Sequence, residues 1–198
     1  MFLVEAAPDQ VPDQLLTLRQ NLGGQVLCAT HSGQAACERI NPKFHRRFVG
    51  TSEDTLHIQR AVGEPVIYGQ NDYNRTTLHG TNSILWNGSM GTIKEVLYEP
   101  AYSLIVEFDG EDHLLKGDDL SHLQHAFAIT VHRAQGSQFP VIFIPLVKAR
   151  NVDRTGIYTA ITRAEHTAIL VGPHSAFANA VNEKPHSDHR RVGLNLRL

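Results

Sequence analysis

The sequence is poor in cysteine and carries no surplus of charge of either sign. Its 198 residues include two cysteines, Cys28 and Cys37, so nothing resembles the disulfide framework of a small secreted protein, although one disulfide is left open. Lysine and arginine number 18 against 20 aspartate and glutamate residues, and the formal net charge is −2. Overall charge therefore gives no indication of nucleic-acid binding, and any DNA contact must come from a local basic face.

Long apolar runs are also absent. No stretch approaches the length that crosses a membrane, and the N-terminus lacks a basic region followed by an apolar one. Together with the low cysteine content, this favours a soluble protein of the reducing cytoplasm.

Histidine is plentiful, at 12 residues, yet its spacing does not predict a metal site. His122 with His125, and His186 with His189, have a conceivable ligand spacing, but no matching cysteine or carboxylate set accompanies either pair. The sequence also shows no Ser-His-Asp or paired-carboxylate pattern. Neither a zinc site nor either of these two hydrolytic patterns is therefore indicated.

The stretch 126–172 organises the chain. It contains two apolar runs, VIFI at 141–144 and AILV at 168–171, which are β-branched or aromatic and are closed by proline or glycine. Such runs are typical of strands buried on both faces of a parallel sheet. A polar segment precedes each run, so the order is loop, strand, helix, strand, which predicts an open α/β sheet with its chemistry on one edge.

Two polar segments carry a family resemblance. TVHRAQGSQF at 130–139 resembles motif V of superfamily 1 helicases, and YTAITRA at 158–164 resembles motif VI. Both are long, correctly ordered and correctly spaced, and the tail RRVGLNLRL at 190–198 resembles a common ending of the same family. The chain is thus similar to the C-terminal part of RecD-like and conjugative TraA-like DNA helicases, which implies a RecA-like (P-loop NTPase-type) α/β lobe.

The N-terminal third fits such a lobe. Residues 12–22 predict a helix with Pro12 in its first turn, 25–29 predict a buried strand, and 34–40 predict a helix that stops near Pro42. In the family, a similar strand, loop and helix open the second lobe, and the helix carries an asparagine like Asn41.

The middle of the chain has a different texture. Asn87-Gly88 and Asp109-Gly110 are hairpin dipeptides, and the short apolar runs around them predict a small antiparallel barrel. RecD-like helicases carry an SH3-like barrel inserted at this point. We therefore assign residues 63–121 to an inserted barrel, and residues 1–62 and 122–198 to one discontinuous second lobe. The strand-like runs are 64–68, 91–96, 102–108 and 113–116.

Arg163 in motif VI is the sharpest candidate for a catalytic residue. Hydrolysis of a nucleoside triphosphate builds negative charge on the γ-phosphoryl oxygens, and a guanidinium stabilises that charge. The motif VI arginine has this role in similar helicases, which predicts that Arg163 binds nucleotide and acts in catalysis. Alternatively, Arg163 caps a helix C-terminus or pairs with Glu165 on the surface.

Motif V supplies the other candidates. Its second half, Gly136-Ser137-Gln138, is assigned to nucleotide binding. Gln138 stands where related helicases commonly have glutamate, whose carboxylate accepts a hydrogen bond from the ribose; an amide oxygen accepts without charge, so its bond should be weaker. Gly136 has a second explanation, a turn that needs a permissive backbone.

The first half of motif V is assigned to single-stranded DNA. Thr130 and His132 suit phosphate oxygens without reading sequence, and Gln135 lies between the DNA and nucleotide halves. Alternatively, Thr130 and His132 form a buried hydrogen-bonded pair that fixes the loop.

Two further features stay ambiguous. Trp86 could stack on a base, although a lone aromatic in a small barrel more often belongs to the core. A basic cluster surrounds Phe44 and Phe48, and it is either a phosphate-contacting surface or a solvated helix end whose aromatics enter the core. The cluster consists of Arg39, Lys43, His45, Arg46 and Arg47.

One absence limits what the chain can do alone. No G-x-x-x-x-G-K-[ST] phosphate loop is present, so the resemblance implies a C-terminal portion whose ATP and Mg²⁺ are bound mainly by an N-terminal RecA-like lobe. We therefore expect no ATP hydrolysis by the chain alone. Expected partners are single-stranded DNA and that lobe, with exonuclease V-type subunits or a conjugative relaxase domain left open. The alternative is a stand-alone, non-catalytic module that binds DNA or a protein.

Overall fold

The computed structural model describes residues 1–33, 35–50, 59–147 and 153–182. They form two compact units, Met1–Arg39 with Ile129–Leu198, called here the sheet unit, and Ile40–Ala128, called the barrel unit. Within the described residues, no helix is both long enough and apolar enough to span a bilayer. The His186/His189 pair and the tail 190–198 lie outside the described residues.

The sheet unit is built on a parallel sheet, as the apolar runs predict. Its strand order is β1-β12-β11-β2-β10, and the pairs β1/β12, β12/β11 and β11/β2 are parallel. Residues 142–145 of β11 and 168–171 of β12 are buried, which confirms the two predicted core strands. The strands are β1 (Phe2–Val4), β2 (Gln25–Cys28), β10 (Ala128–Thr130), β11 (Phe139–Pro145) and β12 (Ala164–Val171).

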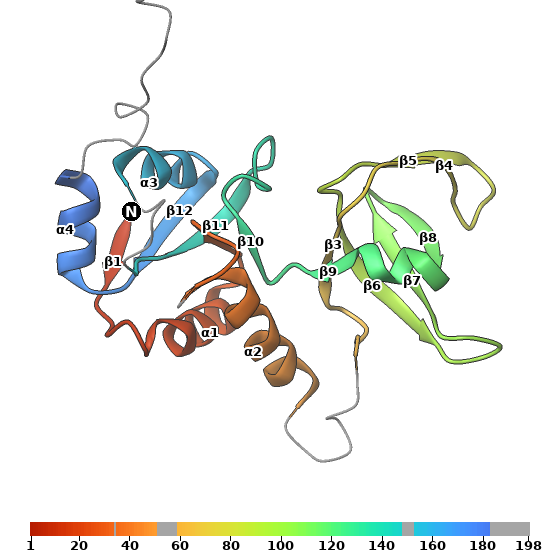
Figure 1. The fold of residues 1–198 in the computed structure, drawn as a ribbon, viewed down its shortest axis with the longest axis horizontal. Helices are drawn as coiled ribbons and strands as arrows, with labels where there is room; N and C mark the ends of the chain where they lie inside the picture. Colours follow the sequence, from red (N-terminus) through yellow and green to blue (C-terminus); the bar gives the residue numbers. More distant parts are fainter. Residues whose placement is uncertain (34, 51–58, 148–152, 183–198) are drawn as a thin grey trace, which may run out of the picture. The chain divides into compact units, whose positions relative to one another are not determined.

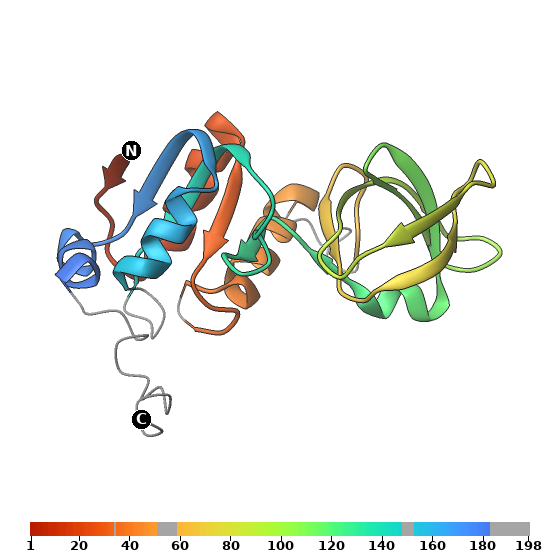
Figure 2. The same ribbon diagram turned by 90° about the horizontal axis from the view of Figure 1, so that it is seen from above.

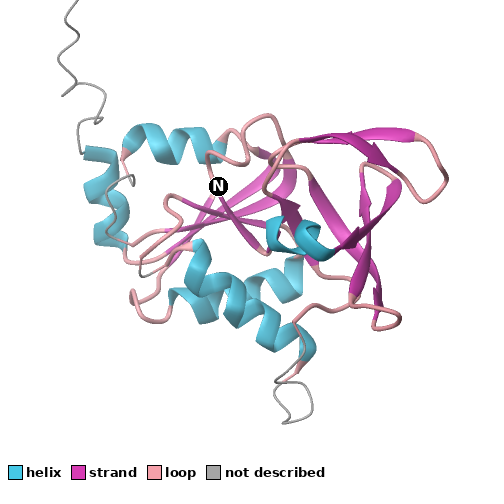
Figure 3. Ribbon diagram, turned by 45° about the vertical axis from the view of Figure 1, so that its right-hand side comes forward, coloured by secondary structure: helices cyan, strands magenta, loops and turns pink. Residues whose placement is uncertain are grey.

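Helices cover both faces of this sheet. Helix α1 (Val11–Leu22) packs on one face of β11 and β12, and α3 (Arg154–Ile161) packs on the other (Figures 1 and 3). Helix α3 begins at a capped end, because the Asp153 side chain accepts a hydrogen bond of 2.7 Å from the Gly156 amide. Helix α4 (His174–Asn182) packs beside α3.

Helix α2 (Cys37–Val49) is longer than its sequence predicts. The prediction that it stops near Pro42 is wrong, because Ile40 and Phe44 lie one turn apart and are both buried, so the apolar face continues past the proline. Pro42 is exposed and lies early in the helix, where it removes one backbone hydrogen bond without displacing the apolar face.

The barrel unit is antiparallel and curls around a single core (Figure 2). One sheet has the order β8-β7-β6-β3-β9, and β4 pairs with β5 in a separate ribbon. The core includes Tyr68, Leu85, Val106, Phe108 and Leu115, each nearly inaccessible to solvent. The strands are β3 (Pro65–Tyr68), β4 (Asp72–Thr76), β5 (Asn82–Leu85), β6 (Met90–Leu97), β7 (Ser103–Phe108), β8 (Glu111–Lys116) and β9 (Leu123–His125); a 3-10 helix, η2, spans Gly117–His122.

The two predicted hairpin dipeptides have different outcomes. Asp109-Gly110 joins the paired strands β7 and β8 with backbone φ angles of 51° and 84°, so this hairpin is confirmed. Asn87-Gly88 is also a turn, with the Ser89 amide bonded to the Trp86 carbonyl at 2.9 Å, but β5 pairs with β4 and not with β6. The second dipeptide therefore redirects the chain between sheets.

Two polar side chains, one buried and one partly buried, hold the barrel unit together. Arg75, 8% exposed, donates to the carboxylates of Asp72 (2.8 Å) and Asp119 (2.9 Å) and to the Leu114 carbonyl (2.9 Å). The Asn41 side chain of α2 donates to the Ala128 carbonyl at 2.9 Å, and its oxygen accepts from the Ala128 amide at 2.7 Å. Each bridges segments that are distant in sequence.

Candidate functional site

The motif V segment runs from the carboxyl ends of the parallel strands to their amino ends. At its start, the Val131 amide donates to the carbonyl of Cys28, the last residue of β2, at 2.9 Å. At its end, Phe139 opens β11, whose Ile142 pairs with Gln25 at the amino end of β2. The candidate residues are therefore divided between the carboxyl ends and the amino ends of the parallel strands. The order of elements in the sequence predicts instead that the chemistry lies on one edge of the sheet.

Arg163 lies at the amino edge, between α3 and β12. Its backbone amide donates to the Ala160 carbonyl at 3.0 Å, and its carbonyl accepts from the Phe139 amide at 2.9 Å. The end of motif VI thus touches Phe139, the last residue of motif V, which directly follows Gln138 in the chain.

The Arg163 side chain is half-buried and incompletely bonded. Its Nη2 lies 3.4 Å from Thr162 Oγ1, and its Nε is buried without a hydrogen-bond partner. Within the described part of the chain, no ion pair joins Arg163 to Glu165, so the surface-pair alternative is not formed there. A buried donor without a partner costs free energy, which an acceptor such as a phosphate oxygen would recover.

The glycine-containing end of motif V is a tight turn. Gly136 has a φ of 89°, and the Ser137 amide donates to the Ala134 carbonyl at 3.1 Å. The positive φ supports the backbone explanation for Gly136. Gln138 is exposed and immediately precedes Phe139, so its amide is free to meet a ligand beside Arg163.

The first half of motif V has a structural role as well. Thr130 Oγ1 accepts from the Arg133 amide at 3.3 Å, and the Thr130 carbonyl accepts from the Ala134 amide at 3.1 Å, so Thr130 fixes the turn that follows it. His132 and Gln135 are exposed. No bond between the side chains of Thr130 and His132 occurs in the described structure, so the alternative of a buried pair is not formed.

The two cysteines are free thiols in the sheet unit. Cys28 ends β2 and Cys37 begins α2, and both are buried. A hydrogen bond with Cys37, followed by burial, raises the pKa of the Cys28 thiol. The disulfide that the sequence leaves open is therefore not formed in this structure.

The basic cluster near α2 is divided between core and surface. Phe44 is 4% exposed, and its ring centroid lies 5.8 Å from that of Phe127, as the core alternative predicts, whereas Phe48 is 47% exposed. Arg46 and Arg47 are exposed on the same helix. Contact with phosphate by these two arginines stays a prediction.

Trp86 is not a core residue. It is 54% exposed and meets the 58%-exposed Tyr73 edge to face, with ring centroids 5.7 Å apart. An exposed aromatic pair on the β4–β5 ribbon is therefore available for stacking.

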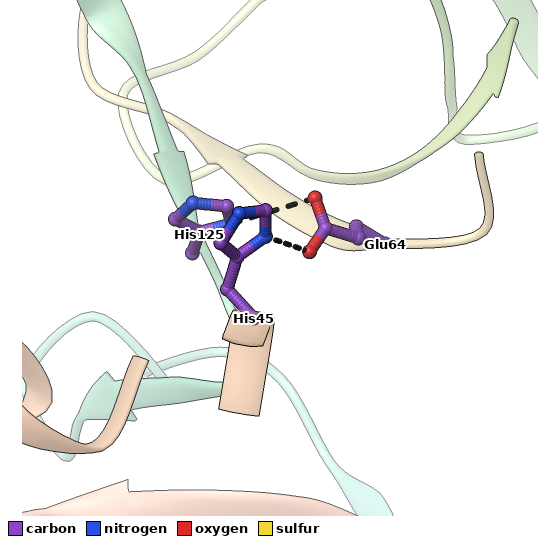
Figure 4. Close-up of side chains that lie close together, drawn as sticks. All are labelled: His45, Glu64 and His125. Atoms are coloured by element: carbon purple, nitrogen blue, oxygen red, sulfur yellow. Dashed lines mark hydrogen bonds and ion pairs between the residues drawn. The ribbon is translucent and has the colours of Figure 1, made fainter. Parts of the chain in front are cut away.

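Sequence spacing missed one group of side chains in the barrel unit that could hold a metal ion. His45, Glu64 and His125 present ligand atoms that all lie within 4.8 Å of one another (Figure 4). His122 is not a member; its ring packs against Tyr68 at 6.1 Å. Because the three residues come from distant segments, no local spacing reveals them.

Comparisons with known proteins show which helicases this chain resembles. Residues 125–171 match the UvrD-like helicase C-terminal domain. The ATP-dependent RecD2 DNA helicase of Deinococcus radiodurans is 31% identical over 184 residues, which are 88% of this chain and 24% of that protein. The RecBCD enzyme subunit RecD of Mycolicibacterium smegmatis is 26% identical over 176 residues, 88% of this chain and 29% of the subunit. The chain thus spans about a quarter of the length of these curated relatives.

Solved structures give a weaker likeness. Bacteroides Pif1 bound to single-stranded DNA has a TM-score of 0.49 and 18% identity, covering 83% of this chain and 49% of that one. The parallel sheet and the inserted antiparallel barrel are established by the present structure itself. From the sequence relatives and the matched domain, the chain is homologous to the RecD2 and RecD helicases over most of its length, and its residues 125–171 match the UvrD-like helicase C-terminal domain.

Proposed function

We propose that this chain serves as the second motor lobe, with its inserted barrel, of an ATP-dependent DNA helicase. The observation that carries the proposal is the position of Arg163. Its backbone is fixed between α3 and β12 and bonded to Phe139, while its side chain keeps a buried, unpartnered Nε. A guanidinium with spare donors, carried on a fixed backbone, suits an anionic ligand.

On the nucleotide side, the chain's own residues would act as follows. Arg163 would stabilise the charge that develops on the γ-phosphoryl group of ATP, which is the group transferred to water. Gln138, exposed beside it, would accept a hydrogen bond from the ribose. Mg²⁺ and most of the triphosphate would be held by a lobe that carries a phosphate loop, because this chain has none.

On the DNA side, contacts would come from the opposite end of motif V. His132 and Gln135 are exposed, and the Thr130 side chain holds the turn that presents them. Imidazole and amide groups contact phosphates without reading bases, so binding would be independent of sequence. Residues 131–138 lead from this end to Phe139, which bonds Arg163. One short segment would therefore link the DNA contacts to the nucleotide contacts.

The test compares the chain alone with the chain joined to a phosphate-loop lobe, both assayed for ATP turnover with and without single-stranded DNA. We expect DNA-stimulated turnover only in the joined protein, because half of a cleft cannot position Mg²⁺ and the γ-phosphate together. Turnover by the chain alone that Arg163→Ala abolishes, or a joined protein that ignores DNA, would contradict the proposal.

A second candidate function is a non-catalytic binding module, and the exposed Tyr73–Trp86 pair favours it. In that case Trp86→Ala should weaken binding of the chain to single-stranded oligonucleotides by 1–3 kcal/mol, roughly the value of one stacked base. Tyr98→Ala is the matched control, since Tyr98 is a 70%-exposed aromatic of the same unit. Equal effects of the two substitutions in fluorescence anisotropy would count against a specific stacking site.

A further inference from the structure

Three segments of the barrel unit bring a carboxylate and two imidazoles together. His45 lies on α2, Glu64 immediately precedes β3, and His125 ends β9. Glu64 Oε1 lies 2.5 Å from His45 Nδ1, and Glu64 Oε2 lies 3.8 Å from His125 Nδ1. Figure 4 shows the carboxylate facing both rings. The imidazole rings lie 4.6 Å apart, centroid to centroid.

Burial makes the charge of the Glu64 carboxylate costly unless that charge is paired. The Glu64 side chain is fully buried, whereas each imidazole keeps 16% of its surface exposed. A buried carboxylate must be paired, and the ion-pair partners of Glu64 among the described residues are these two histidines.

The donor set suits a divalent transition-metal ion. Neutral imidazole nitrogen and carboxylate oxygen are the ligands that Zn²⁺ prefers, and three protein ligands leave one position for water. The ligand atoms lie within 4.8 Å of one another, so short side-chain movements would bring them to one ion. The partial exposure of both rings leaves a path for entry.

One residue opposes a metal at this point. Arg60 Nη1 lies 2.7 Å from His125 Nε2, and because a guanidinium only donates, this nitrogen accepts and the ring proton resides on Nδ1. His125 Nδ1 is buried without a hydrogen-bond partner among the described residues. A metal would need the Nδ1 lone pair, so the ring proton must move and the bond to Arg60 must break. Arg60 would still hold the Leu123 carbonyl, which it now contacts at 2.8 Å.

We propose that His45, Glu64 and His125 form a binding site for a divalent transition-metal ion of the Zn²⁺ class, with Arg60 as the competing cation. The ion would join α2, the start of β3 and the end of β9, and would supply the countercharge that the buried Glu64 carboxylate requires. This site lies wholly within the barrel unit and does not depend on the proposed motor function.

The first experiment titrates the whole chain, freed of metal by a chelator, with Zn²⁺ in calorimetry and with Co²⁺ in visible spectroscopy. We expect one saturable site, a tetrahedral Co²⁺ spectrum without the near-ultraviolet band of a thiolate ligand, and a rise in melting temperature. A thiolate band would assign binding to Cys28 and Cys37 instead. No saturation by about 1 mM metal, the limit of a useful affinity, would overturn the proposal.

The variants test the ligands separately. Glu64→Gln and His125→Gln should each weaken Zn²⁺ binding by a hundredfold or more, on the order of the largest losses seen when only an outer-shell partner is removed. Exposed His79 gives the matched control, and His79→Gln should bind as the parent does. Equal affinity in all three variants would place the metal elsewhere and overturn the site.

Arg60 provides a variant whose effect has the opposite sign. Arg60→Gln removes a positive charge beside the site and frees His125 Nε2, so it should strengthen metal binding about tenfold while the other ligands stay intact. A structural role of the cluster alone predicts no gain. If Glu64→Gln fails to fold, the parent titration and Arg60→Gln together still decide the question, since weaker binding in Arg60→Gln contradicts the proposal.

Discussion

The sheet unit and the barrel unit bury their polar groups in different ways. In the sheet unit the side-chain hydrogen bonds of the candidate residues are local: Thr130 bonds the amide of Arg133, three residues on, and Arg163 bonds its neighbour Thr162. In the barrel unit they are distant, since Arg75 and Asp119 lie 44 positions apart in the sequence and Asn41 and Ala128 lie 87 positions apart. Contiguous motifs can be recognised in a sequence, whereas networks of residues that are distant in the sequence can be recognised only in the structure.

The same difference separates function from support. The sheet unit presents exposed or unpartnered groups next to each other, as in Gln138 and Arg163, which leaves them available to ligands. In the barrel unit, by contrast, charged groups pair with each other inside the unit, as Arg75 does with the carboxylates of Asp72 and Asp119. Substitutions should therefore damage activity in the first unit and stability in the second, and the following predictions test that division in order of expected effect.

Arg163→Ala should produce the largest change. In the protein joined to a phosphate-loop lobe, DNA-stimulated turnover should fall on the order of a thousandfold, equivalent to about 4 kcal/mol, with little change in nucleotide affinity or melting temperature. Arg163→Lys should rescue little, because an ammonium lacks the planar fork. Exposed Arg154, at the start of α3, is the control, and Arg154→Ala should keep full activity. A collapse of the melting temperature in Arg163→Ala would make this arginine structural and break the comparison.

Arg75→Met should give the largest loss of stability. It leaves the carboxylates of Asp72 and Asp119 without their partner, and because both are 30% exposed, we expect a loss of about 2–3 kcal/mol of unfolding free energy. Urea unfolding followed by circular dichroism and by fluorescence of Trp86, the single tryptophan, measures it. Exposed Arg46 gives the control variant Arg46→Met, which should change stability by less than about 0.5 kcal/mol. A loss in the control as large as that in Arg75→Met would refute the network's importance.

DNA binding by the isolated chain should be weak, independent of sequence and sensitive to salt. The net charge of −2 offers no long-range attraction, so only local groups such as His132, Arg46 and Arg47 are available. Fluorescence anisotropy at low and moderate salt should show a clear loss of affinity as salt rises, and His132→Ala should weaken binding more than His79→Ala. Tight binding that ignores salt would contradict this prediction.

A pH dependence should mark the barrel unit. Burial raises the pKa of Asp119, but hydrogen bonds from Arg75 and the Lys116 amide, together with the charge of His122, lower it more, so the net shift is downward. Because the folded-state pKa lies below the ordinary value of 3.8, this stabilisation is complete above that value and is lost as pH falls below it. Asp119→Asn should therefore reduce the loss of stability on acidification, which melting temperatures between about pH 2 and 6 would measure. An unchanged loss would refute this linkage.

Local pattern predicted the elements that carry their own signal. The core strands β11 and β12, helix α1 and the Asp109-Gly110 hairpin follow from apolar runs, a first-turn proline and residues that tolerate positive φ. The ribbon strands β4 and β5 were not predicted. Their sequences, DYNRT and NSIL, are short and largely polar, so neither the helical nor the strand period of apolar residues stands out.

The limits at the candidate site have a similar cause. Motifs V and VI identified Arg163 and its neighbours, but not the division of motif V between two sheet edges, which depends on β2 lying between β10 and β11. The domain boundaries 63–121 stay a prediction beside a compact unit that runs from Ile40 to Ala128. The cluster of His45, Glu64 and His125 could not be found from the sequence, since His45 and Glu64 lie 19 residues apart and meet only after α2 and β3 have formed.

Asn41 has a consequence for how such a chain can be assembled. It stands next to Ile40, the first residue of the barrel unit, and holds both backbone groups of Ala128, the last. The entry and exit of an entire unit therefore lie within the reach of one amide side chain. A unit whose ends meet so closely can be gained, lost or exchanged by a host chain across a gap only one side chain wide.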